Sequence, residues 1–448
     1  MVKPDSAVWL KQTLITLLGG IDEGIHIINE AGITVYYNSQ AGAIDGLDHD
    51  AVIDRHILDI YPSLSAESST LLKVLSTKSP IYNKEQTFTN YKGVRVTTVN
   101  STLPIIVENR LVGAVEISKD YTKVRELSEK YVDLQARAFD KNGELAAIQA
   151  GARSTFADII GQNVRMVELK SMSRRTADKD STILIVGEAG TGKELFGQAI
   201  HNASNRNIHP FLVQNCAVLP EAMLEATLFG TTDSSYSGAK NRSGLLEIAH
   251  GGTLFLDEVS SMSLRLQTKL VRVLQEGYVQ RIGEQQVRQL NVRLIVAMSM
   301  DPLDAIRRGQ LQEDLYYRIS VVTLRVPPLR QRKEDLSLLI HHFLHFYNQI
   351  FGMKVMGLSE EATQIFYTYD WPGNIRELQL AIEGAMNVVL GDVIAPEHLP
   401  HHLRESLGVY GNAPSLAIAE EMLSKGASLH QTLAEIEEHL IKYALNIT

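Results

Sequence analysis

A glycine-rich segment between an apolar run and a helical stretch constrains the fold of this 448-residue chain more than any other feature. The segment reads Gly187-Glu188-Ala189-Gly190-Thr191-Gly192-Lys193-Glu194. It follows the apolar run Ile183–Val186, and a helical stretch comes directly after it. Glycines let backbone N–H groups approach phosphate oxygens, and the N-terminus of a helix adds partial positive charge. The pattern predicts a strand, a phosphate-binding loop and a helix, with Lys193 at the outer phosphates; a glycine-rich turn without a ligand is the alternative.

Two adjacent acids follow a second apolar run. The run covers residues 253–256, and Asp257 and Glu258 come directly after it. Asp257 can hold a magnesium ion, directly or through water, while Glu258 can polarise the water that attacks the γ-phosphate of ATP. A pair of acids that caps a helix is the alternative, but their place downstream of a glycine-rich loop favours the catalytic interpretation. The expected cofactors are therefore ATP and Mg²⁺.

Nearly continuous apolar runs alternate with helical stretches over about residues 155–400. They are residues 183–186, 253–256 and 292–296, the last with one arginine. Such runs suit strands that are buried on both faces of a parallel sheet, because helices cover both faces of such a sheet. We therefore predict an α/β fold for this part of the chain.

Shorter strand-like runs separated by turns occupy residues 1–120. Residues 24–29 and 33–38 flank Glu30-Ala31-Gly32 and predict a hairpin, and two further runs cover residues 94–99 and 111–117. This pattern indicates a small α+β domain with a sensory role. His26, inside the first run, is interpreted as a strand residue rather than a haem ligand.

A helix is expected after this domain, over about residues 117–150, and residues 121–154 are assigned to a linker. Its apolar residues recur at steps of three or four: Ile117, Tyr121, Val124, Leu127, Tyr131, Leu134 and Ala138. That spacing resembles a heptad seam, so a coiled-coil dimer is one interpretation. A helix that packs on its own domain is the other.

Composition narrows the class of protein. The net charge of −9 argues against a nucleic-acid footprint spread over the whole surface. The single cysteine, Cys216, cannot form an intramolecular disulfide, which fits a reducing compartment. No apolar run reaches the roughly 18 residues that a membrane span needs. We therefore expect a cytoplasmic protein with no membrane partner.

From about residue 156 to residue 400, the chain closely resembles the AAA+ domain of bacterial sigma-54-dependent transcription activators. Besides the glycine-rich loop and residues 252–258, the matching stretches are VQNCA (213–217), LVRVLQEG (270–277), DLYYR (314–318), VPPLR (326–330) and WPGNIREL (371–378). The resemblance implies a P-loop domain with a parallel sheet and, from about residue 330, a helical lid. It also implies self-association into rings that hydrolyse ATP between subunits and remodel RNA polymerase bound to sigma-54.

The resemblance assigns roles to four residues. Asn215 would couple the catalytic Glu258 to the state of the nucleotide. Arg318 would reach the γ-phosphate in a neighbouring subunit and stabilise charge in the transition state. Arg376 would sense nucleotide from the lid. For each arginine, a surface salt bridge is the alternative. The glutamate after the loop lysine, Glu194, is usual in the family.

Three departures from the family pattern bear on activity. The polymerase-contacting loop, usually Gly-Ala-Phe-Thr-Gly-Ala, reads Ser234-Ser235-Tyr236-Ser237-Gly238-Ala239 here. Gln312 stands where an intersubunit arginine is usual, and Ser299 where an asparagine is expected. Two functions therefore stay open. The first is an ATPase that remodels sigma-54 polymerase. The alternative is a nucleotide-binding regulator with impaired hydrolysis, acting as a non-catalytic or sigma-54-independent binding module.

The two ends of the chain complete the expected layout. Residues 1–120 resemble a PAS sensory domain, and the combination of PAS and AAA+ is similar to activators of arginine catabolism; the small-molecule effector is unknown. Residues 401–448 are expected to begin as a loop and to continue, from about Leu429, as the helix that leads into the family's helix-turn-helix. Contact with DNA is expected only if that missing helix-turn-helix is restored.

Overall fold

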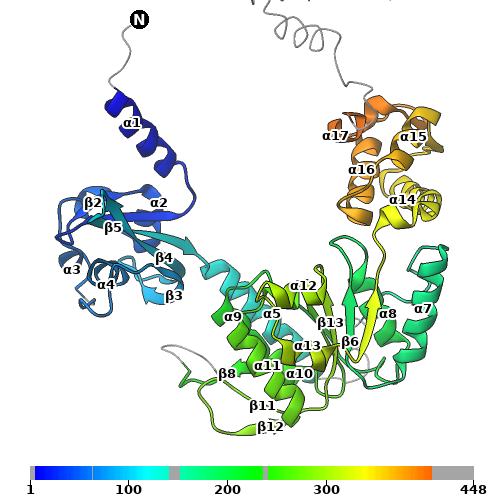
Figure 1. Cartoon of the computed structure of the whole chain (residues 1–448), viewed down its shortest axis with the longest axis horizontal. Coiled ribbons are helices and arrows are strands. Elements are labelled where there is room, and N and C mark those ends of the chain that lie inside the picture. Colours follow the sequence, from blue (N-terminus) through cyan, green and yellow to red (C-terminus); the bar gives the residue numbers. More distant parts are fainter. Residues whose placement is uncertain (1–5, 63, 141–151, 236–240, 406–448) are drawn as a thin grey trace, which may run out of the picture. The chain divides into compact units, whose positions relative to one another are not determined.

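The computed structural model describes residues 6–62, 64–140, 152–235 and 241–405, which fall into two compact units (Figure 1). The first unit combines Met1–Lys141 with two segments from the middle of the chain, Val218–Ile248 and Val279–Arg288. The second unit holds the remaining residues. Within the described part of the chain, no helix is both long and apolar enough to cross a membrane.

The front of the first unit is a five-stranded antiparallel sheet with the strand order β2-β1-β5-β4-β3. The strands are β1 (Gly24–Asn29), β2 (Thr34–Tyr37), β3 (Ile81–Thr89), β4 (Arg95–Val107) and β5 (Arg110–Asp120). The predicted hairpin joins β1 to β2. Its turn is closed by the Asn29 side chain, whose Oδ1 accepts hydrogen bonds from the N–H groups of Ala31 (2.9 Å) and Ile33 (3.0 Å). Gly32 takes the left-handed conformation that this turn requires (φ 78°).

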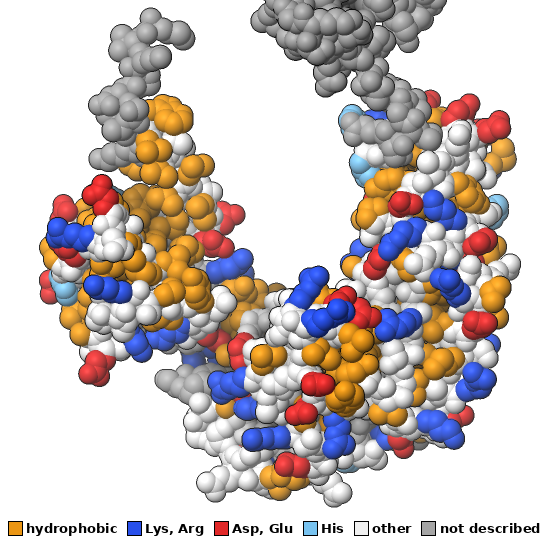
Figure 2. Space-filling view, viewed as in Figure 1, with side chains coloured by type: hydrophobic (Ala, Val, Ile, Leu, Met, Phe, Trp, Pro, Cys, Tyr) orange, Lys and Arg blue, Asp and Glu red, His pale blue; other side chains and the backbone are white. Residues whose placement is uncertain are grey.

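Short helices pack beside this sheet: α2 (Ser39–Asp45), α3 (Ile57–Ile60) and α4 (Thr70–Thr77). The longer helix α1 (Ser6–Gly19) precedes the sheet and extends away from it (Figure 1). A buried cluster joins the sheet to α4, because Ile28 and Ala114 of the strands lie in one core with Leu71 of the helix. The result is the α+β, PAS-like domain that the sequence predicted. Helix α1 carries exposed apolar side chains, and its part of the surface is orange in Figure 2.

Helix α5 (Thr122–Asp140) follows β5 and begins later than predicted. The expectation that the helix includes Ile117 is wrong, because β5 is hydrogen-bonded on both sides, to β1 and to β4, and Ile117 pairs with Ile25. The helix starts where this pairing ends, and the Asp120 carboxylate accepts a hydrogen bond from the Thr122 N–H (2.8 Å). Residues 141–151 of the predicted linker lie outside the described residues, and residues 152–154 are not helical.

Helix α5 packs against the middle segments inside the first unit. These segments form α9 (Glu221–Phe229), β8 (Gly230–Thr231), β9 (Arg242–Ser243) and α10 (Leu245–Ile248). Arg242 forms ion pairs with Glu129 and, at 3.2 Å, with Asp133 of α5. Ser128 and Thr227 hydrogen-bond through their hydroxyls at 3.1 Å. Helix α5 therefore contacts both the antiparallel sheet, through β4, and the elements that precede and follow residues 236–240 in the chain.

The second unit is built on a parallel five-stranded sheet with the order β14-β6-β13-β10-β7. Its strands are β6 (Ile183–Val186), β7 (Phe211–Asn215), β10 (Thr253–Asp257), β13 (Arg293–Met298) and β14 (Val322–Arg325). The helices of this part are α7 (Val164–Ala177), α8 (Lys193–Asn202), α11 (Leu264–Glu276), α12 (Pro302–Arg307) and α13 (Glu313–Ile319). Strands β6 and β13 are buried at every position, as expected for a sheet covered on both faces. The predicted α/β fold is confirmed.

A helical lid follows the sheet in the chain. It consists of α14 (Leu336–Phe351), β15 (Gly357–Leu358), α15 (Glu360–Thr368), α16 (Asn374–Val388), β16 (Val393–Ile394) and α17 (His401–Glu405). Its core surrounds the fully buried Trp371, whose indole N–H donates to the Phe366 carbonyl (2.9 Å). The expected loop-like start of the tail is wrong, because Leu403 of α17 is buried in this core. The predicted helix from Leu429 lies outside the described residues. Two more strands, β11 (Tyr278–Gln280) and β12 (Val287–Gln289), pair with each other.

Candidate nucleotide site

The glycine-rich loop lies at the carboxyl end of β6, between the carboxyl ends of β13 and β14 in the parallel sheet. Gly190 and Gly192 have φ values of 78° and 95°, which lie in the left-handed region that residues other than glycine rarely adopt. A Cβ atom on Gly190 would also collide with the carbonyl oxygen of Gly373 in the lid. The Thr191 hydroxyl donates to the Glu188 carbonyl (2.7 Å), which closes the loop on itself.

Helix α8 begins at the end of this loop without a side-chain cap. Its N-cap residue is Gly192, which has no side chain to accept a hydrogen bond from the first turn. The N–H groups at the start of a helix need an acceptor, and the helix dipole favours an anion there. The loop and the start of α8 therefore suit the phosphates of a nucleotide. The residues concerned are Gly187, Glu188, Ala189, Gly190, Thr191, Gly192, Lys193 and Glu194.

Lys193 is buried and its ammonium group lies among acceptors at the top of the sheet. Nζ donates to the carbonyl oxygen of Gly187 (2.8 Å) and to the hydroxyl of Ser299 (2.8 Å). It also lies 3.6 Å from Oε1 of Glu258. A buried ammonium needs acceptors or anions around it, and these neighbours are also where phosphate oxygens could compete for the lysine.

Asp257 and Glu258 lie side by side at the end of β10. Glu258 takes a left-handed backbone conformation (φ 52°), which turns the chain sharply after the strand. Its carboxylate accepts hydrogen bonds from the hydroxyl and the N–H of Ser299, the latter at 3.3 Å. Burial raises the pKa of Asp257, and the neighbouring Glu258 raises it further, while Lys193 opposes both. A cation bound at Asp257 would favour its charged form.

Asn215 lies at the end of the neighbouring strand β7, within reach of this acid pair. Its Nδ2 donates to Oδ2 of Asp257 (3.3 Å), and its Oδ1 accepts from the Ala217 N–H (2.8 Å). The resemblance paired Asn215 with Glu258 instead. Among the described residues, Glu258 has Ser299 and Lys193 as partners, and Asn215 contacts the acid pair through Asp257.

The lid holds the glycine-rich loop through residues to which the sequence assigned no role. The Asn374 amide donates to Oε2 of Glu188 (3.2 Å) and to the Ala189 carbonyl (3.0 Å). Arg330 forms a two-pronged ion pair with Glu188, which lowers the pKa of that carboxyl. The buried Arg332 donates to the Thr191 carbonyl (3.2 Å). The one sequence signal for these contacts is that Asn374 and Arg330 lie inside stretches that match the family, residues 371–378 and 326–330.

The two arginines assigned to catalysis occupy different places. Arg376 is exposed on α16, and its Cβ would lie 3.2 Å from a Cβ built on Gly190, so it borders the loop. Arg318 is exposed in the last turn of α13 and makes no hydrogen bond or ion pair with any described residue of the site. Gln312 caps the start of α13, but its side chain folds onto α11, where Nε2 donates to the Leu264 carbonyl (3.0 Å).

The predicted partner loop, Tyr236, Ser237, Gly238 and Ala239, lies outside the described residues. The two preceding serines are described. The Ser234 hydroxyl donates to the Gly283 carbonyl (2.8 Å), and the Ser235 hydroxyl donates to the Ile282 carbonyl. The two serines that depart from the family pattern therefore tie the residues just before the predicted loop to residues 282–283.

Asp257 is the residue that could hold magnesium. In the described ranges, no cluster of three or more His, Cys, Asp or Glu side chains could hold a metal ion alone. Magnesium in nucleotide sites is usually bound by one or two carboxylates together with phosphate oxygens and water. A single well-placed carboxylate beside a phosphate-binding loop fits that donor set.

Two family models match the chain between residues 159 and 412. The sigma-54 interaction domain matches residues 159–325, and the AAA+ ATPase lid domain matches residues 330–412. The glycine-rich loop and the acid pair lie within the first match, and Asn374 and Arg376 lie within the second.

Whole-chain relatives and a solved structure agree with these matches. The transcriptional activator RocR of Bacillus subtilis is 41% identical over 390 residues, which cover 87% of this chain and 82% of that protein. The transcriptional regulatory protein ZraR of Escherichia coli K12 is 37% identical over 360 residues, covering 79% and 77%. The crystal structure of NtrX from Brucella abortus in complex with ATP is 30% identical, with a TM-score of 0.54 over 63% of this chain and 61% of that one.

Proposed function

The chain belongs to the sigma-54-dependent transcriptional activators, and from that premise we propose how its parts work. The nucleotide domain binds ATP with Mg²⁺ and hydrolyses it between the subunits of a self-associated ring. The energy released remodels RNA polymerase bound to sigma-54, and a small-molecule effector of the PAS-like domain controls the reaction. The observation that carries this proposal is the joint position of Lys193, Asp257 and Glu258 beside an uncapped helix N-terminus.

ATP binding is supported by the loop and by a relative. The loop provides backbone N–H groups, the start of α8 and the Lys193 ammonium, all of which favour phosphate oxygens. NtrX, whose fold this chain shares over the matched region, was crystallised with ATP and also with ADP. The contacts from Asn374 and Arg330 to the loop would let the lid respond to whether the phosphates are present.

Hydrolysis is assigned to residues at the ends of β10 and β7. Magnesium, when bound at Asp257, would offset phosphate charge during the reaction. Glu258 would orient and polarise the attacking water, which requires its carboxylate to leave Ser299. Asn215 would keep Asp257 in place, since it already donates to that carboxylate. Arg376 would contact nucleotide from the lid side of the loop.

Self-association is supported by two exposed surfaces. Arg318 is exposed and faces no described partner, as expected of an arginine that acts on the nucleotide of a neighbouring subunit. On α5, Leu127 and Leu134 are 65% and 64% exposed. They lie seven residues apart on one face of the helix, which fits a coiled-coil seam between two copies. The loop that contains Tyr236 and Ser237 would contact the polymerase.

One observation favours the alternative function. Gln312 is neutral and its side chain is hydrogen-bonded to Leu264 and Thr268 of its own subunit, so it cannot stabilise charge on a neighbour's phosphate. If ATP binds but no hydrolysis occurs at any protein concentration, the chain is a nucleotide-dependent binding module rather than a motor.

Nucleotide binding is tested with Lys193→Ala and a matched control. We expect at least a tenfold loss of affinity for a fluorescent ATP analogue, since charge-assisted contacts to phosphate are worth about 1.5–3 kcal/mol. Lys354→Ala removes an exposed lysine of the lid and is expected to bind as the wild type does. Equal affinity of Lys193→Ala and wild type would refute the assignment.

A further inference from the structure

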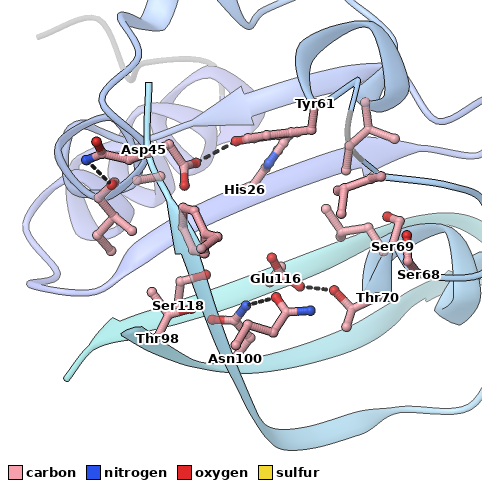
Figure 3. A pocket seen from close by; sticks show the side chains of 18 of the residues that line it. His26, Asp45, Tyr61, Ser68, Ser69, Thr70, Thr98, Asn100, Glu116 and Ser118 are labelled. Carbon is pink, nitrogen blue, oxygen red and sulfur yellow. Dashed lines mark hydrogen bonds between the residues drawn. The ribbon is translucent and has the colours of Figure 1, made fainter. Parts of the chain in front are cut away.

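The PAS-like domain contains a cavity of about 600 Å³ that is partly open to solvent (Figure 3). Residues from all parts of the domain line it, including His26 of β1, Asp45 of α2, Thr70 of α4, Asn100 of β4 and Glu116 of β5. This volume lies within the roughly 300–1,000 Å³ of typical small-molecule sites. The cavity is therefore large enough for a ligand of several to some tens of non-hydrogen atoms, and its lining defines which chemistry it accepts.

Two carboxylates in the lining are each held through one oxygen only. Oδ2 of Asp45 accepts hydrogen bonds from the hydroxyls of Tyr37 (2.7 Å) and Tyr61. Oε2 of Glu116 accepts from the hydroxyls of Thr102 (2.9 Å) and Thr70. These contacts orient both side chains, as Figure 3 shows for Asp45 and Glu116. The other oxygens, Oδ1 of Asp45 and Oε1 of Glu116, accept no hydrogen bond from any described residue and stay available to a ligand.

The cavity has two carboxyl groups, those of Asp45 and Glu116, without a compensating cation among the described residues of its wall. None of the described residues that line it is a lysine or an arginine. His26 does not compensate, because burial lowers its pKa to about 4 and leaves it neutral near pH 7. Burial raises the pKa of Glu116 more than the hydrogen bonds from Thr70 and Thr102 lower it, and the charge of Asp45 raises it further. Burial raises the pKa of Asp45 as well. A positive group inside the cavity would favour the charged form of both carboxyl groups and so lower their pKa values.

Two more polar atoms in the wall lack partners. Oδ1 of Asn100 and the hydroxyl of Thr98 are buried without a hydrogen bond, and both residues line the cavity. Buried polar atoms are nearly always hydrogen-bonded, so each one left without a partner calls for an explanation. Aromatic rings of Tyr61, Phe88 and Tyr91 complete the lining, and such rings attract cations through their faces. A ligand with several N–H donors would satisfy the free oxygens.

We propose that this cavity binds a small organic cation, an aliphatic ligand with an ammonium or guanidinium group, held by Glu116 and Asp45 and completed by Asn100. The inference deepens the proposed function, since it names the chemical class of the effector that the PAS-like domain senses. Ammonium and guanidinium groups carry only donors, and the free oxygens of the cavity are acceptors. Anions are excluded by the same two carboxylates.

Calorimetric titration of the full chain with compounds of matched size tests the proposal. The cationic probes are 1,4-diaminobutane, n-butylamine and n-butylguanidine. The neutral and anionic counterparts are 1,4-butanediol and succinate. We expect at least one cationic probe to bind about tenfold or more tightly than 1,4-butanediol, because hydrogen bonds to a charged group are stronger than neutral ones. Succinate is expected not to bind.

Variants then locate the site. Glu116→Gln keeps the shape of the side chain and removes its charge, so it is expected to weaken the bound cation about tenfold or more. Glu108→Gln makes the same chemical change at an exposed position between β4 and β5 and is expected to have no effect. If thermal unfolding shows that Glu116→Gln is not folded, Asp45→Asn replaces it, because Asp45 is the second acid of the same wall.

The outcomes separate this inference from the proposed function. The inference is overturned if no cationic probe binds up to about 10 mM, which corresponds to very weak affinity. It is also overturned if the diol or succinate binds as tightly as the cations, or if the folded acid variants bind like the wild type. Nucleotide binding is measured in the same samples. If the wild-type chain binds ATP but none of the cationic probes, only the proposed ligand class is refuted. If the wild-type chain does not bind ATP, the proposed function is refuted.

Discussion

At the scale of single residues, Lys193, Glu258 and Ser299 hold one another at the top of the sheet. The Ser299 hydroxyl contacts both the lysine ammonium and the glutamate carboxylate. In the proposed mechanism, Lys193 binds phosphate and Glu258 polarises water, and both groups are occupied by Ser299 here. We therefore expect bound nucleotide to displace these contacts before Glu258 acts.

Gln312→Arg is expected to accelerate ATP hydrolysis. An arginine aimed at the γ-phosphate from a neighbouring subunit is worth on the order of a thousandfold or more in turnover. Gln312 lacks the charge and is hydrogen-bonded to α11, whereas arginine is longer and could extend past that helix. Turnover is measured for both proteins at concentrations above and below assembly, and the increase is expected only above it.

Arg318→Ala serves as the opposite control for this experiment. It is expected to abolish turnover in both backgrounds if Arg318 acts between subunits. If Gln312→Arg hydrolyses no faster at any concentration, the glutamine does not limit the enzyme. Ser299→Asn, which restores the family's expected residue beside Glu258, is then the variant to test.

His201 is expected to make stability depend on pH. Burial, followed by the charge of Arg293, lowers its pKa from 6.5 to about 4 in the folded protein. The unfolded chain therefore binds more protons between these values, and stability present above pH 6.5 is lost as the pH falls toward 4. Between pH 7 and pH 5.5 the free energy of unfolding is expected to fall by about 1 kcal/mol from this residue alone.

The contribution of His201 is isolated by comparison with His201→Asn. Asparagine can still hydrogen-bond the Thr253 hydroxyl, which lies 2.9 Å from Nδ1 of His201, but it does not titrate. The difference in urea unfolding between the two proteins should shrink as the pH is lowered. A difference that does not change from pH 7 to pH 5.5 would contradict the expected protonation.

At the scale of elements, the contacts of α5 show how the linker is held. Burial alone would raise the pKa of Glu129, but hydrogen bonds from Arg242 and Arg125 outweigh it and lower that pKa. Arg242 closely follows residues 236–240, which are proposed to contact the polymerase, and Glu129 lies on the helix that follows β5. An ion pair between them couples these two elements within one compact unit.

A double-mutant cycle measures this coupling. Arg242→Ala, Glu129→Ala and the double variant are compared by urea unfolding of the full chain. We expect a coupling free energy of about 1 kcal/mol, at the upper end for partly exposed pairs, because the Glu129 side chain is 35% exposed. Strictly additive effects of the two substitutions would show that the pair does not hold α5.

Glu126→Ala is the matched control on the same helix. Glu126 is exposed on α5 and no ion pair joins it to Arg242 in the described structure. Its substitution is expected to be additive with Arg242→Ala. Coupling of similar size for Glu126 would point to a general charge effect on the helix rather than to a specific contact.

At the scale of the whole molecule, each of the two compact units has buried clusters of its own. The sensory sheet is complete once β5 ends at Asp120, since β5 pairs with both β1 and β4. The nucleotide sheet and the lid have their own buried clusters in the second unit. The proposed functions of sensing and hydrolysis therefore fall on parts with separate cores.

Residues 1–120 are expected to fold without the rest of the chain. A fragment that ends at Asp120 should show the circular dichroism of a mixed α+β protein and a cooperative urea transition. A fragment that ends at Ser101 lacks β5, which lies between β1 and β4, and is expected to be unfolded. A longer fragment that folds when the first one does not would place the boundary within α5.

Local sequence signals determined the nucleotide loop, the acid pair and the strand-forming runs. Each of these features is contiguous: glycines set the loop conformation, and apolar runs identify strands buried on both faces. The same holds for the hairpin of β1 and β2, whose turn is closed by Asn29 within the hairpin itself. For this reason both fold classes could be predicted from the residues alone.

Only the tertiary structure decided which distant side chains meet. Asp45 and Glu116 come from a helix and a strand far apart in the chain, and no periodicity indicates that they share one cavity. Likewise, the contact of Ser299 with Glu258 and that of Asn374 with the glycine-rich loop depend on how the strands and the lid pack. Helix α5 begins at Thr122 because β5 keeps its hydrogen bonds to two neighbouring strands up to that point. Local propensity sets the elements, whereas pairing and packing between them set where each element ends and what it touches.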